Sequence, residues 1–361
     1  MEQTSQRELR TVDPTWTLAE LMAHLTRAIT SKGPALALTP SNAKFVNPDI
    51  SLVVPTSGST GISKNVSISA SALVASAQAS NKFLGAKSGQ RWSLLLPLTH
   101  IAGINVLMRS IELGSTPIDL RATKENYPDV DFTAIVPTQL YRALHSDGTL
   151  LRHLKNAKAV LVGGGKLSSQ LREAAEKVGI NVVESYGMTE TSGGCIYDGT
   201  PLDGTSYEVG IDGRIKISGN CLASGYLEAE KLWQESFDGK WFATSDLGTI
   251  VNGKLSVLAR TDDVVVSGGE NISLIAIETA IKNVHSSIEV AAFAMDDSEW
   301  GSAIHLAIAG EKIAEEEIQE ILQTTLGRVA KPKAIYYLDR IPLSALGKVD
   351  RQALTEMVKK K

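Results

Sequence analysis

Between residues 50 and 190, short apolar runs alternate with helix-length amphipathic stretches. The candidate strands are 52–55, 93–96, 133–136, 159–162 and 181–184, and the candidate helices are 70–84, 101–113, 138–145 and 168–178. Strands that alternate with helices of this length are typical of a mostly parallel sheet with helices on its faces. This stretch therefore predicts an α/β fold.

The pattern changes twice after residue 195. From 195 to 260, short β-like runs are separated by turn pairs such as Asp212-Gly213 and Asn252-Gly253, which predicts a β-rich subdomain. Beyond residue 260 we expect helices at 274–282 and 314–326 and strands at 289–295, 302–309 and 334–338. We therefore predict an N-terminal domain at 1–261 and a small α+β C-terminal domain at 262–361.

The composition is ordinary for a globular protein, with 43% hydrophobic residues, 21% charged residues and a net charge of -4. This charge balance gives no reason to expect nucleic-acid binding. Cys195 and Cys221 lack CxxC spacing and nearby histidines, so we expect neither a zinc site nor a disulfide framework. The sequence shows no apolar leader and no membrane-spanning run. We predict a cytoplasmic protein and a homodimer.

The loop at 56–64 follows the first candidate strand and gathers hydroxyls, glycines and a lysine. Its candidate binding residues are Thr56, Ser57, Gly58, Ser59, Thr60, Gly61 and Lys64. Glycines let the backbone approach an anion, hydroxyls and N–H groups donate to its oxygens, and lysine adds charge. The spacing does not match a Walker A loop. By itself the stretch is either a phosphate-binding loop or a Ser/Gly linker.

Four later segments accompany this loop along the chain, at 186–191 (YGMTET), 244–248 (TSDLG), 260–271 and 342–348. Together, the five resemble the ordered core motifs of the adenylate-forming acyl-CoA synthetase superfamily. The resemblance implies a large N-terminal α/β domain with a β-rich subdomain and a small mobile C-terminal domain. Because 55 residues precede the loop, fewer than is usual in the family, we expect a shortened N-terminal subdomain. The first 44 residues are expected to lie outside the resemblance.

The resemblance also implies a reaction. A carboxylate attacks the α-phosphate of ATP to give an acyl-adenylate and pyrophosphate, and the thiol of coenzyme A then displaces AMP. Two anions must be brought together, which requires well-placed positive charge. The loop would hold the β- and γ-phosphates, Thr189 would contact the α-phosphate, and Glu190 would bind Mg²⁺.

Other residues would hold the nucleoside. By resemblance, Asp246 would bind both ribose hydroxyls and Arg260 would support the same sugar, although Ser245 stands where the family usually has glycine. An aromatic ring and backbone amides suit a purine. The adenine pocket would consist of Tyr186, Gly187, Gly163, Gly164 and Gly165. A simple turn after a strand is an equal alternative for the three consecutive glycines.

In the C-terminal domain, Lys348 would bridge the substrate carboxylate and the α-phosphate, where its charge offsets the charge of the transition state. Asp262 matches the hinge about which this domain would rotate. Gly268 and Gly269 would then line the path of the coenzyme A thiol, where glycine permits close approach.

Residues 97–103 (PLTHIAG) bear on which carboxylic acid is the substrate. They resemble the family segment that directs a histidine, here His100, toward the acyl pocket. Arg109 follows in an apolar stretch. In the o-succinylbenzoate–CoA ligase branch of the superfamily, an arginine at this register binds the second carboxylate of an aromatic dicarboxylic acid. The resemblance therefore implies ligation of o-succinylbenzoate in menaquinone synthesis. Alternatively, Arg109 extends to solvent or pairs with Glu112.

Three other functions stay open. The chain is alternatively an acyl- or aryl-CoA synthetase for another acid, a ligase that loads a carrier protein, or a nonenzymatic nucleotide-binding relative. No carrier segment is apparent after Lys348, which favours free coenzyme A. The presence of Glu190 and Asp246 together with Lys348 favours an enzyme.

Overall fold

A computed structural model of the protein describes residues 6–56, 64–123, 125–146, 148–267, 270–297, 301–327, 330–343 and 349–359. The chain forms two compact units. The first comprises Met1–Thr244 and Thr249–Ser256, and the second comprises Ser245–Gly248 and Val257–Lys361. The boundary predicted between residues 261 and 262 concerns a domain movement and stays a prediction.

A seven-stranded sheet in the first unit has the order β12-β11-β10-β9-β8-β6-β7. Its strands are β6 (Trp92–Leu94), β7 (Ile118–Asp119), β8 (Phe132–Ile135), β9 (Ala159–Gly163), β10 (Val182–Met188), β11 (Gly193–Tyr197) and β12 (Thr200–Pro201). Neighbouring strands in the series β7, β6, β8, β9 and β10 pair in parallel. The last two strands, β11 and β12, extend the sheet with antiparallel pairing. The predicted, mostly parallel sheet is therefore confirmed.

A six-stranded sheet in the same unit has the order β15-β5-β4-β2-β1-β3. Its strands are β1 (Arg7–Thr11), β2 (Ala35–Ala37), β3 (Phe45–Val46), β4 (Ile50–Thr56), β5 (Lys64–Ser69) and β15 (Gly225–Tyr226). The sequence analysis missed β5, in which Val66 and Ile68 alternate with polar residues. The first strands come from the segment before residue 45, as does the helix α1 (Leu18–Ile29), which begins with a capping box between Thr17 and Glu20.

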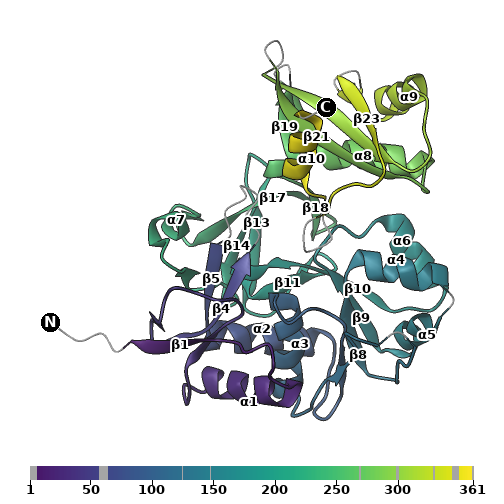
Figure 1. Ribbon diagram of the computed structural model, residues 1–361. Helices are drawn as coiled ribbons and strands as arrows, with labels where there is room; N and C mark the ends of the chain where they lie inside the picture. Colours follow the sequence, from purple (N-terminus) through teal and green to yellow (C-terminus); the bar gives the residue numbers. More distant parts are fainter. Residues whose placement is uncertain are drawn as a thin grey trace. The chain divides into compact units, whose positions relative to one another are not determined.

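Helices α2 (Ala70–Phe83) and α3 (Ile101–Glu112) lie between the two sheets (Figure 1). The other face of the seven-stranded sheet is covered by α4 (Pro137–Ser146), α5 (Thr149–Asn156) and α6 (Ser169–Lys177). One continuous core joins both sheets through the two inner helices, with Leu73 and Leu107 fully buried. Burial of these side chains is the main favourable contribution to folding, and it holds α2 and α3 between the two sheets.

The β-rich region contains β13 (Thr205–Val209), β14 (Arg214–Gly219), α7 (Glu230–Gln234), β16 (Phe237–Asp238), β17 (Trp241–Val251) and β18 (Lys254–Arg260). These strands form a five-stranded sheet in the order β13-β14-β17-β16, with β18 beside β17. The sheet is smaller than the predicted 195–260 subdomain. The reason is that β11 and β12 extend the seven-stranded sheet and β15 joins the six-stranded one.

The second unit contains a hairpin, a mixed three-stranded sheet and three helices. Its elements are β19 (Val264–Ser267), β20 (Glu270–Ser273), α8 (Leu274–Val284), β21 (Glu289–Asp297), β22 (Gly301–Ala309), α9 (Glu315–Leu326), β23 (Ala334–Leu338) and α10 (Arg351–Lys359). Apolar side chains of α8 and α9 pack on one face of the sheet β21-β22-β23, and those of α10 pack on the other. The predicted α+β pattern is confirmed.

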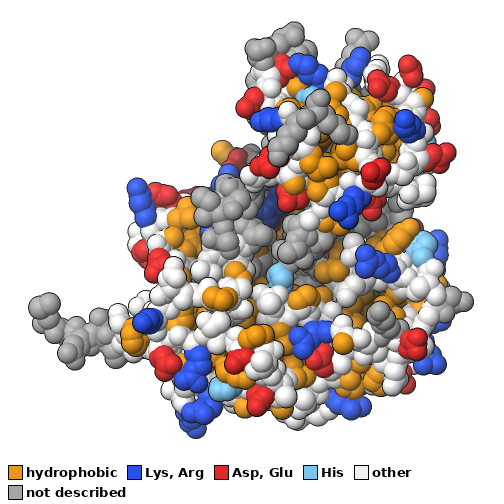
Figure 2. Space-filling view, in the orientation of Figure 1, with side chains coloured by type: hydrophobic (Ala, Val, Ile, Leu, Met, Phe, Trp, Pro, Cys, Tyr) orange, Lys and Arg blue, Asp and Glu red, His pale blue; other side chains and the backbone are white. Residues whose placement is uncertain are grey.

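One face of the surface shows how the charged side chains are distributed. Side chains of both charges are interspersed over the face shown in Figure 2, in keeping with the small net charge of -4. Among the described residues, no helix has both the length and the apolar character needed to cross a membrane.

Candidate functional site

The loop at 56–64 connects two adjacent strands. Its ends, Thr56 of β4 and Lys64 of β5, are register partners, and Thr56 Oγ1 donates to the Lys64 carbonyl oxygen at 3.2 Å. Five predicted phosphate-binding residues of this loop lie outside the described residues: Ser57, Gly58, Ser59, Thr60 and Gly61. The described ends establish a β-hairpin, so the loop leaves β4 and returns in β5 before α2 begins.

Lys64 and Glu190 both contact Tyr226, a residue that the sequence analysis did not identify. Tyr226 lies in β15 and pairs with Val66 of β5. The Lys64 ammonium lies 5.0 Å from the centroid of the Tyr226 ring, a cation–π distance. On the other side, the Tyr226 hydroxyl donates to Glu190 Oε1 at 2.9 Å. A cation and a carboxylate therefore meet at one aromatic side chain.

Tyr226 is held as a neutral hydrogen-bond donor. Burial, and then the charge and hydrogen bond of Glu190, raise the pKa of Tyr226 well above its ordinary value. The phenol consequently keeps its proton and fixes one oxygen of the Glu190 carboxylate. The backbone of Glu190 is held as well, because its carbonyl oxygen accepts from the N–H of Ala223 at 2.8 Å.

The turn that carries Thr189 and Glu190 is stabilised by buried polar contacts. It is a short 3-10 segment, η1 (Thr189–Thr191), followed by Ser192 in the left-handed region at φ 53°. The Ser192 carbonyl oxygen accepts from Asn105 Nδ2 at 2.8 Å and from Ser76 Oγ at 3.2 Å, so α3 and α2 both support it. These contacts hold the backbone directly after Glu190 in place.

Gly187 is required by the close approach of two strands before this turn. The register of β10 against β11 shifts between Tyr186 and Gly187. A Cβ atom on Gly187 would lie 2.1 Å from the carbonyl oxygen of Gly193, a distance that no side chain tolerates. The local packing therefore accounts for this glycine without a ligand.

The predicted adenine-pocket residues gather at one edge of the seven-stranded sheet. Gly163 ends β9, with Gly164 and Gly165 directly after it, and half-buried Tyr186 lies near the end of the parallel neighbour β10. Ligands of open α/β sheets bind at the carboxyl ends of parallel strands. Both segments are thus at the edge where a nucleotide is expected, and their contact with adenine stays a prediction.

His100 immediately precedes α3, and its Nδ1 lies 2.9 Å from Thr99 Oγ1. The side chain is half-buried. The first turn of α3 is pressed against the chain before it, because a Cβ atom on Gly103 would lie 2.2 Å from the carbonyl oxygen of Pro97. The glycine of this motif thus has a packing reason.

Arg109 lies near the opposite end of α3 and is only 4% exposed. Its guanidinium carbon lies 4.9 Å from the ring centroid of Trp92, the first residue of β6, and its Nη2 donates to the Tyr197 hydroxyl at 3.2 Å. The alternative of a solvent-directed side chain is therefore wrong. Within the described residues, the buried Arg109 Nε has no hydrogen-bond partner, although an unsatisfied buried donor costs about 1–3 kcal/mol.

The predicted ribose residues of the second unit contact each other. Arg260 Nη1 lies 3.4 Å from Asp246 Oδ1, and Asp246 is 6% exposed, whereas the arginine is half-exposed. The backbone of Asp262 belongs to the 3-10 segment η2 (Thr261–Asp263), which Thr261 ties to the Ser245 carbonyl oxygen at 3.1 Å.

Three predicted residues of this unit, Gly268, Gly269 and Lys348, lie outside the described residues. The residues on either side of the Lys348 segment are described. Leu343 and Val349 form an antiparallel bridge, and the Asp350 N–H donates to the Pro342 carbonyl oxygen at 2.9 Å. The chain therefore closes on itself at the base of this segment.

A preformed metal cage is not the arrangement seen here. In the part of the chain that the structure describes, His, Cys, Asp and Glu side chains nowhere gather in threes around a possible metal position. Glu190 is thus a single candidate carboxylate ligand. Magnesium is commonly bound by one or two carboxylates together with substrate phosphates, so these residues fit a metal that arrives with a nucleotide.

Comparison with known proteins gives consistent matches over nearly the whole chain. Residues 3–227 match the AMP-binding enzyme family, and residues 276–348 match the AMP-binding enzyme C-terminal domain. Because the first match begins at residue 3, the expectation that the first 44 residues lie outside the resemblance is wrong.

Two curated relatives and two solved structures illustrate the similarity. A probable 2-succinylbenzoate–CoA ligase of Mycobacterium tuberculosis is 34% identical, and the match covers 93% of this chain and 94% of that protein. A 2-succinylbenzoate–CoA ligase of Listeria monocytogenes is 31% identical, and the match covers 84% of this chain and 69% of that protein. Two structures of o-succinylbenzoate CoA synthetase from Bacillus subtilis share the fold. One, in complex with the acyl-adenylate intermediate, has a TM-score of 0.77 at 24% identity over 96% of this chain and 82% of that one. The other, in complex with ATP and magnesium ion, has a TM-score of 0.76 at 23% identity, and the match covers 95% of this chain and 83% of that chain.

Proposed function

The chain belongs to the AMP-binding enzyme family, and we propose that it is the ATP-dependent ligase that joins o-succinylbenzoate to coenzyme A in menaquinone synthesis. The observation that carries the chemistry is the meeting of Lys64 and Glu190 at Tyr226. It provides a cation for phosphate oxygens beside a carboxylate for a divalent metal. The choice of acid is supported by the curated relatives that match most of the chain.

In the first half-reaction, a carboxylate oxygen of the acid attacks the α-phosphate of ATP, and pyrophosphate leaves. Lys64 and the loop before it would bind the β- and γ-phosphates, and Thr189 would donate to the α-phosphate. Bound magnesium would neutralise part of the phosphate charge, and Glu190, held by Tyr226, would ligate it. Lys348 would bring the two anionic reactants together.

In the second half-reaction, the thiol of coenzyme A attacks the acyl carbon, and AMP leaves. Asp246 would keep its hold on the ribose, since Arg260 fixes the carboxylate from one side. Tyr186 and the glycines at 163–165 would hold the adenine. We propose that Asp262 is the hinge that exchanges Lys348 for Gly268 and Gly269 between the two steps.

The decisive experiment measures pyrophosphate and AMP release with ATP, magnesium and a panel of acids, each with and without coenzyme A. We expect o-succinylbenzoate to give AMP release that depends on coenzyme A. If another aromatic or fatty acid gives this signal and o-succinylbenzoate does not, the acid is wrong and the ligase chemistry stands. If no acid gives pyrophosphate or AMP release and the protein still binds nucleotide, it is a nonenzymatic nucleotide-binding protein.

Tyr226→Phe tests the site at its centre. The variant keeps the ring beside Lys64 but removes the hydroxyl that donates to Glu190. A hydrogen bond to a charged group contributes about 1.5–3 kcal/mol, so we expect the magnesium concentration needed for half-maximal pyrophosphate release to rise roughly tenfold. Tyr207→Phe, which removes an exposed hydroxyl bonded to the Gly253 carbonyl oxygen, is the control. An unchanged magnesium dependence would contradict the role of Tyr226.

Arg109→Lys tests recognition of the second carboxylate. We propose that this carboxylate satisfies the buried Nε of Arg109, which has no other partner among the described residues. Lysine keeps the charge but lacks the planar array of donors, so KM for o-succinylbenzoate should rise roughly ten- to a hundred-fold. KM for ATP should stay the same. A lower melting temperature with unchanged KM values would instead assign Arg109 to packing against Trp92 and Tyr197.

The proposal also includes a homodimer and a cytoplasmic location. Light scattering on the purified chain tests the first, and fractionation of the native cells tests the second. Neither affects the chemistry above, because the residues it uses belong to one chain.

A further inference from the structure

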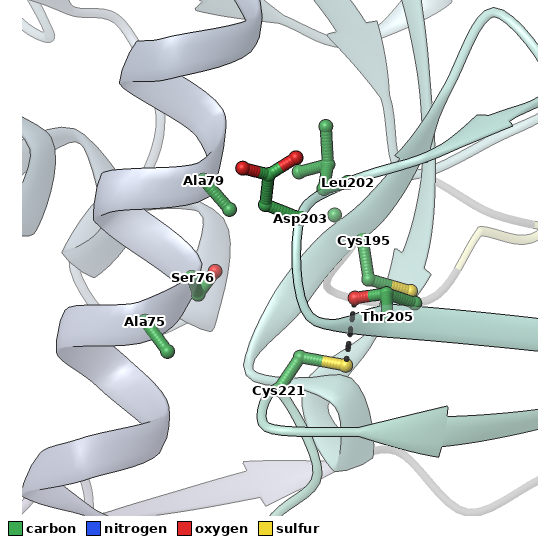
Figure 3. Close-up of a pocket in the computed structure, with 9 residues that line it drawn as sticks. Ala75, Ser76, Ala79, Cys195, Leu202, Asp203, Thr205 and Cys221 are labelled. Carbon is green, nitrogen blue, oxygen red and sulfur yellow. Dashed lines mark hydrogen bonds between the residues drawn. The ribbon is translucent and has the colours of Figure 1, made fainter.

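The two cysteines, distant in sequence, lie side by side in the first unit. Cys195 belongs to β11, Cys221 follows β14, and both are buried. Both side chains line one small recess and lie close enough for each to shift the pKa of the other. Thr205 Oγ1 donates to Cys221 Sγ at 3.5 Å, as the dashed line in Figure 3 shows. The sequence spacing gave no indication of this pair.

A small recess lies beside the pair. Its volume is about 10 Å³, room for about one water molecule. It is lined on one side by α2, through Ala75, Ser76 and Ala79, and on the other by the two cysteines together with Leu202, Asp203 and Thr205 (Figure 3). Asp203 is exposed. A small uncharged oxidant that enters this recess would meet both cysteines.

We propose that Cys195 and Cys221 form a dithiol site that a hydroperoxide oxidises to an intramolecular disulfide. The assignment follows from the one small recess that both side chains line and from the hydroxyl donor at one of the two sulfur atoms. It does not depend on the ligase function, because none of these residues belongs to the proposed substrate site.

The two sulfur atoms are not equivalent. Their difference determines which cysteine attacks the peroxide and which one then forms the disulfide. Cys221 accepts from the Thr205 hydroxyl and is 5% exposed, whereas Cys195 is 1% exposed. The neighbouring Cys195 thiol and the Thr205 hydroxyl lower the pKa of the Cys221 thiol to about 7, and the neighbouring Cys221 and burial raise the pKa of Cys195 well above its ordinary value. Cys221 is accordingly the thiolate nucleophile near neutral pH, and Cys195 is the thiol that resolves the product.

The reaction balances with one hydroperoxide. The Cys221 thiolate attacks one peroxide oxygen, the O–O bond breaks, and hydroxide leaves, which gives a sulfenic acid. The Cys195 sulfur then attacks the Cys221 sulfur. The S–O bond breaks, the S–S bond forms, and the hydroxide that leaves takes up the Cys195 proton as water. In total, two thiols lose two electrons and two protons, and hydrogen peroxide is reduced to two molecules of water.

The test uses the full chain, reduced and then exposed to hydrogen peroxide near neutral pH. We expect the intact mass to fall by two hydrogen atoms, a non-reducing peptide map to join the segments around residues 195 and 221, and a dithiol reductant to reverse both changes. Cys195→Ser should instead trap a sulfenic acid at Cys221 that reacts with a dimedone probe. Cys221→Ser should leave Cys195 reduced under the same conditions.

Thr205→Val provides a second, milder variant that keeps both cysteines. Loss of one hydrogen bond to the Cys221 sulfur should slow disulfide formation roughly two- to ten-fold near neutral pH. Two observations would overturn the proposal. One is that the wild-type chain gains oxygen atoms but forms no disulfide. The other is that both thiols can still be alkylated when the peroxide-treated protein is unfolded.

Discussion

Lys348→Ala is expected to abolish formation of the acyl-adenylate while largely preserving its conversion to the thioester. The acid and the α-phosphate are both anions, and the charge that offsets them in the first transition state is proposed to come from this one ammonium group. Removal of a single preorganised donor of this kind costs about a hundred- to a thousand-fold in rate. Pyrophosphate release from ATP and o-succinylbenzoate measures the first step.

The second step is measured separately, from synthetic acyl-adenylate and coenzyme A. This reaction needs no attack on phosphate, so the Lys348→Ala variant should carry it out at close to the wild-type rate. Lys359→Ala, an exposed lysine on α10, is the matched control and should leave both steps unchanged. Equal loss of both half-reactions would contradict the assignment of Lys348 to adenylation.

Arg351→Ala is expected to destabilise the second unit by about 3–5 kcal/mol, the usual cost of leaving a buried ion pair without one partner. Arg351 Nη1 lies 2.9 Å from Asp263 Oδ1, its Nη2 lies 2.9 Å from Glu278 Oε1, and its Nε donates to the Ala292 carbonyl oxygen at 2.9 Å. Both carboxylate side chains are largely enclosed, at 12% and 13% exposure. Burial raises the pKa of Glu278, and Arg351 opposes that change.

Hydrogen exchange on the full chain measures this loss without the need to separate the units. Amides of α8 and β21 should exchange at least about a hundredfold faster in Arg351→Ala, since each 1.4 kcal/mol corresponds to a factor of ten. Peptides of the seven-stranded sheet serve as an internal reference. Arg340→Ala, at an exposed position, is the matched control. Unchanged protection of α8 would show that the two ion pairs contribute little.

Arg351 also links two parts of the proposed mechanism. Its Asp263 partner follows the proposed hinge residue, and Arg351 itself opens α10, directly after the bridge between Leu343 and Val349. A variant that loosens Arg351 should therefore lower adenylation more than it lowers thioester formation. The difference would have the same sign as in Lys348→Ala, but it would be smaller.

Most secondary structure was predictable because it depends on local periodicity. The apolar stretch before Arg109 predicted a helix at 101–113, and α3 occupies Ile101–Glu112. The strands predicted at 133–136 and 159–162 appear as β8 and β9, paired in parallel. Such segments can be predicted because the spacing of their apolar residues follows the period of the helix or strand that buries them on one face.

The environment of Arg109 shows where this reasoning stops. The sequence placed an arginine on an apolar helix face but left open whether the side chain reaches a carboxylate, Glu112 or solvent. In the structure it packs on Trp92 and bonds to Tyr197. Trp92 belongs to β6 and Tyr197 to β11, so their meeting depends on how the strands are ordered in the sheet rather than on any local pattern.

The sequence by itself determined the α/β class, the family and the order of its motifs, because these follow from residue types and spacing along one segment at a time. Only the tertiary structure decided that β5 pairs with β15 and so brings Tyr226 to both Lys64 and Glu190. It also decided that the segment before residue 45 completes the same sheet, and that Cys195 and Cys221 line one recess. Each of these contacts joins segments far apart in the chain. They form because burial of the shared core fixes which strands become neighbours, and no local pattern of residues specifies that choice.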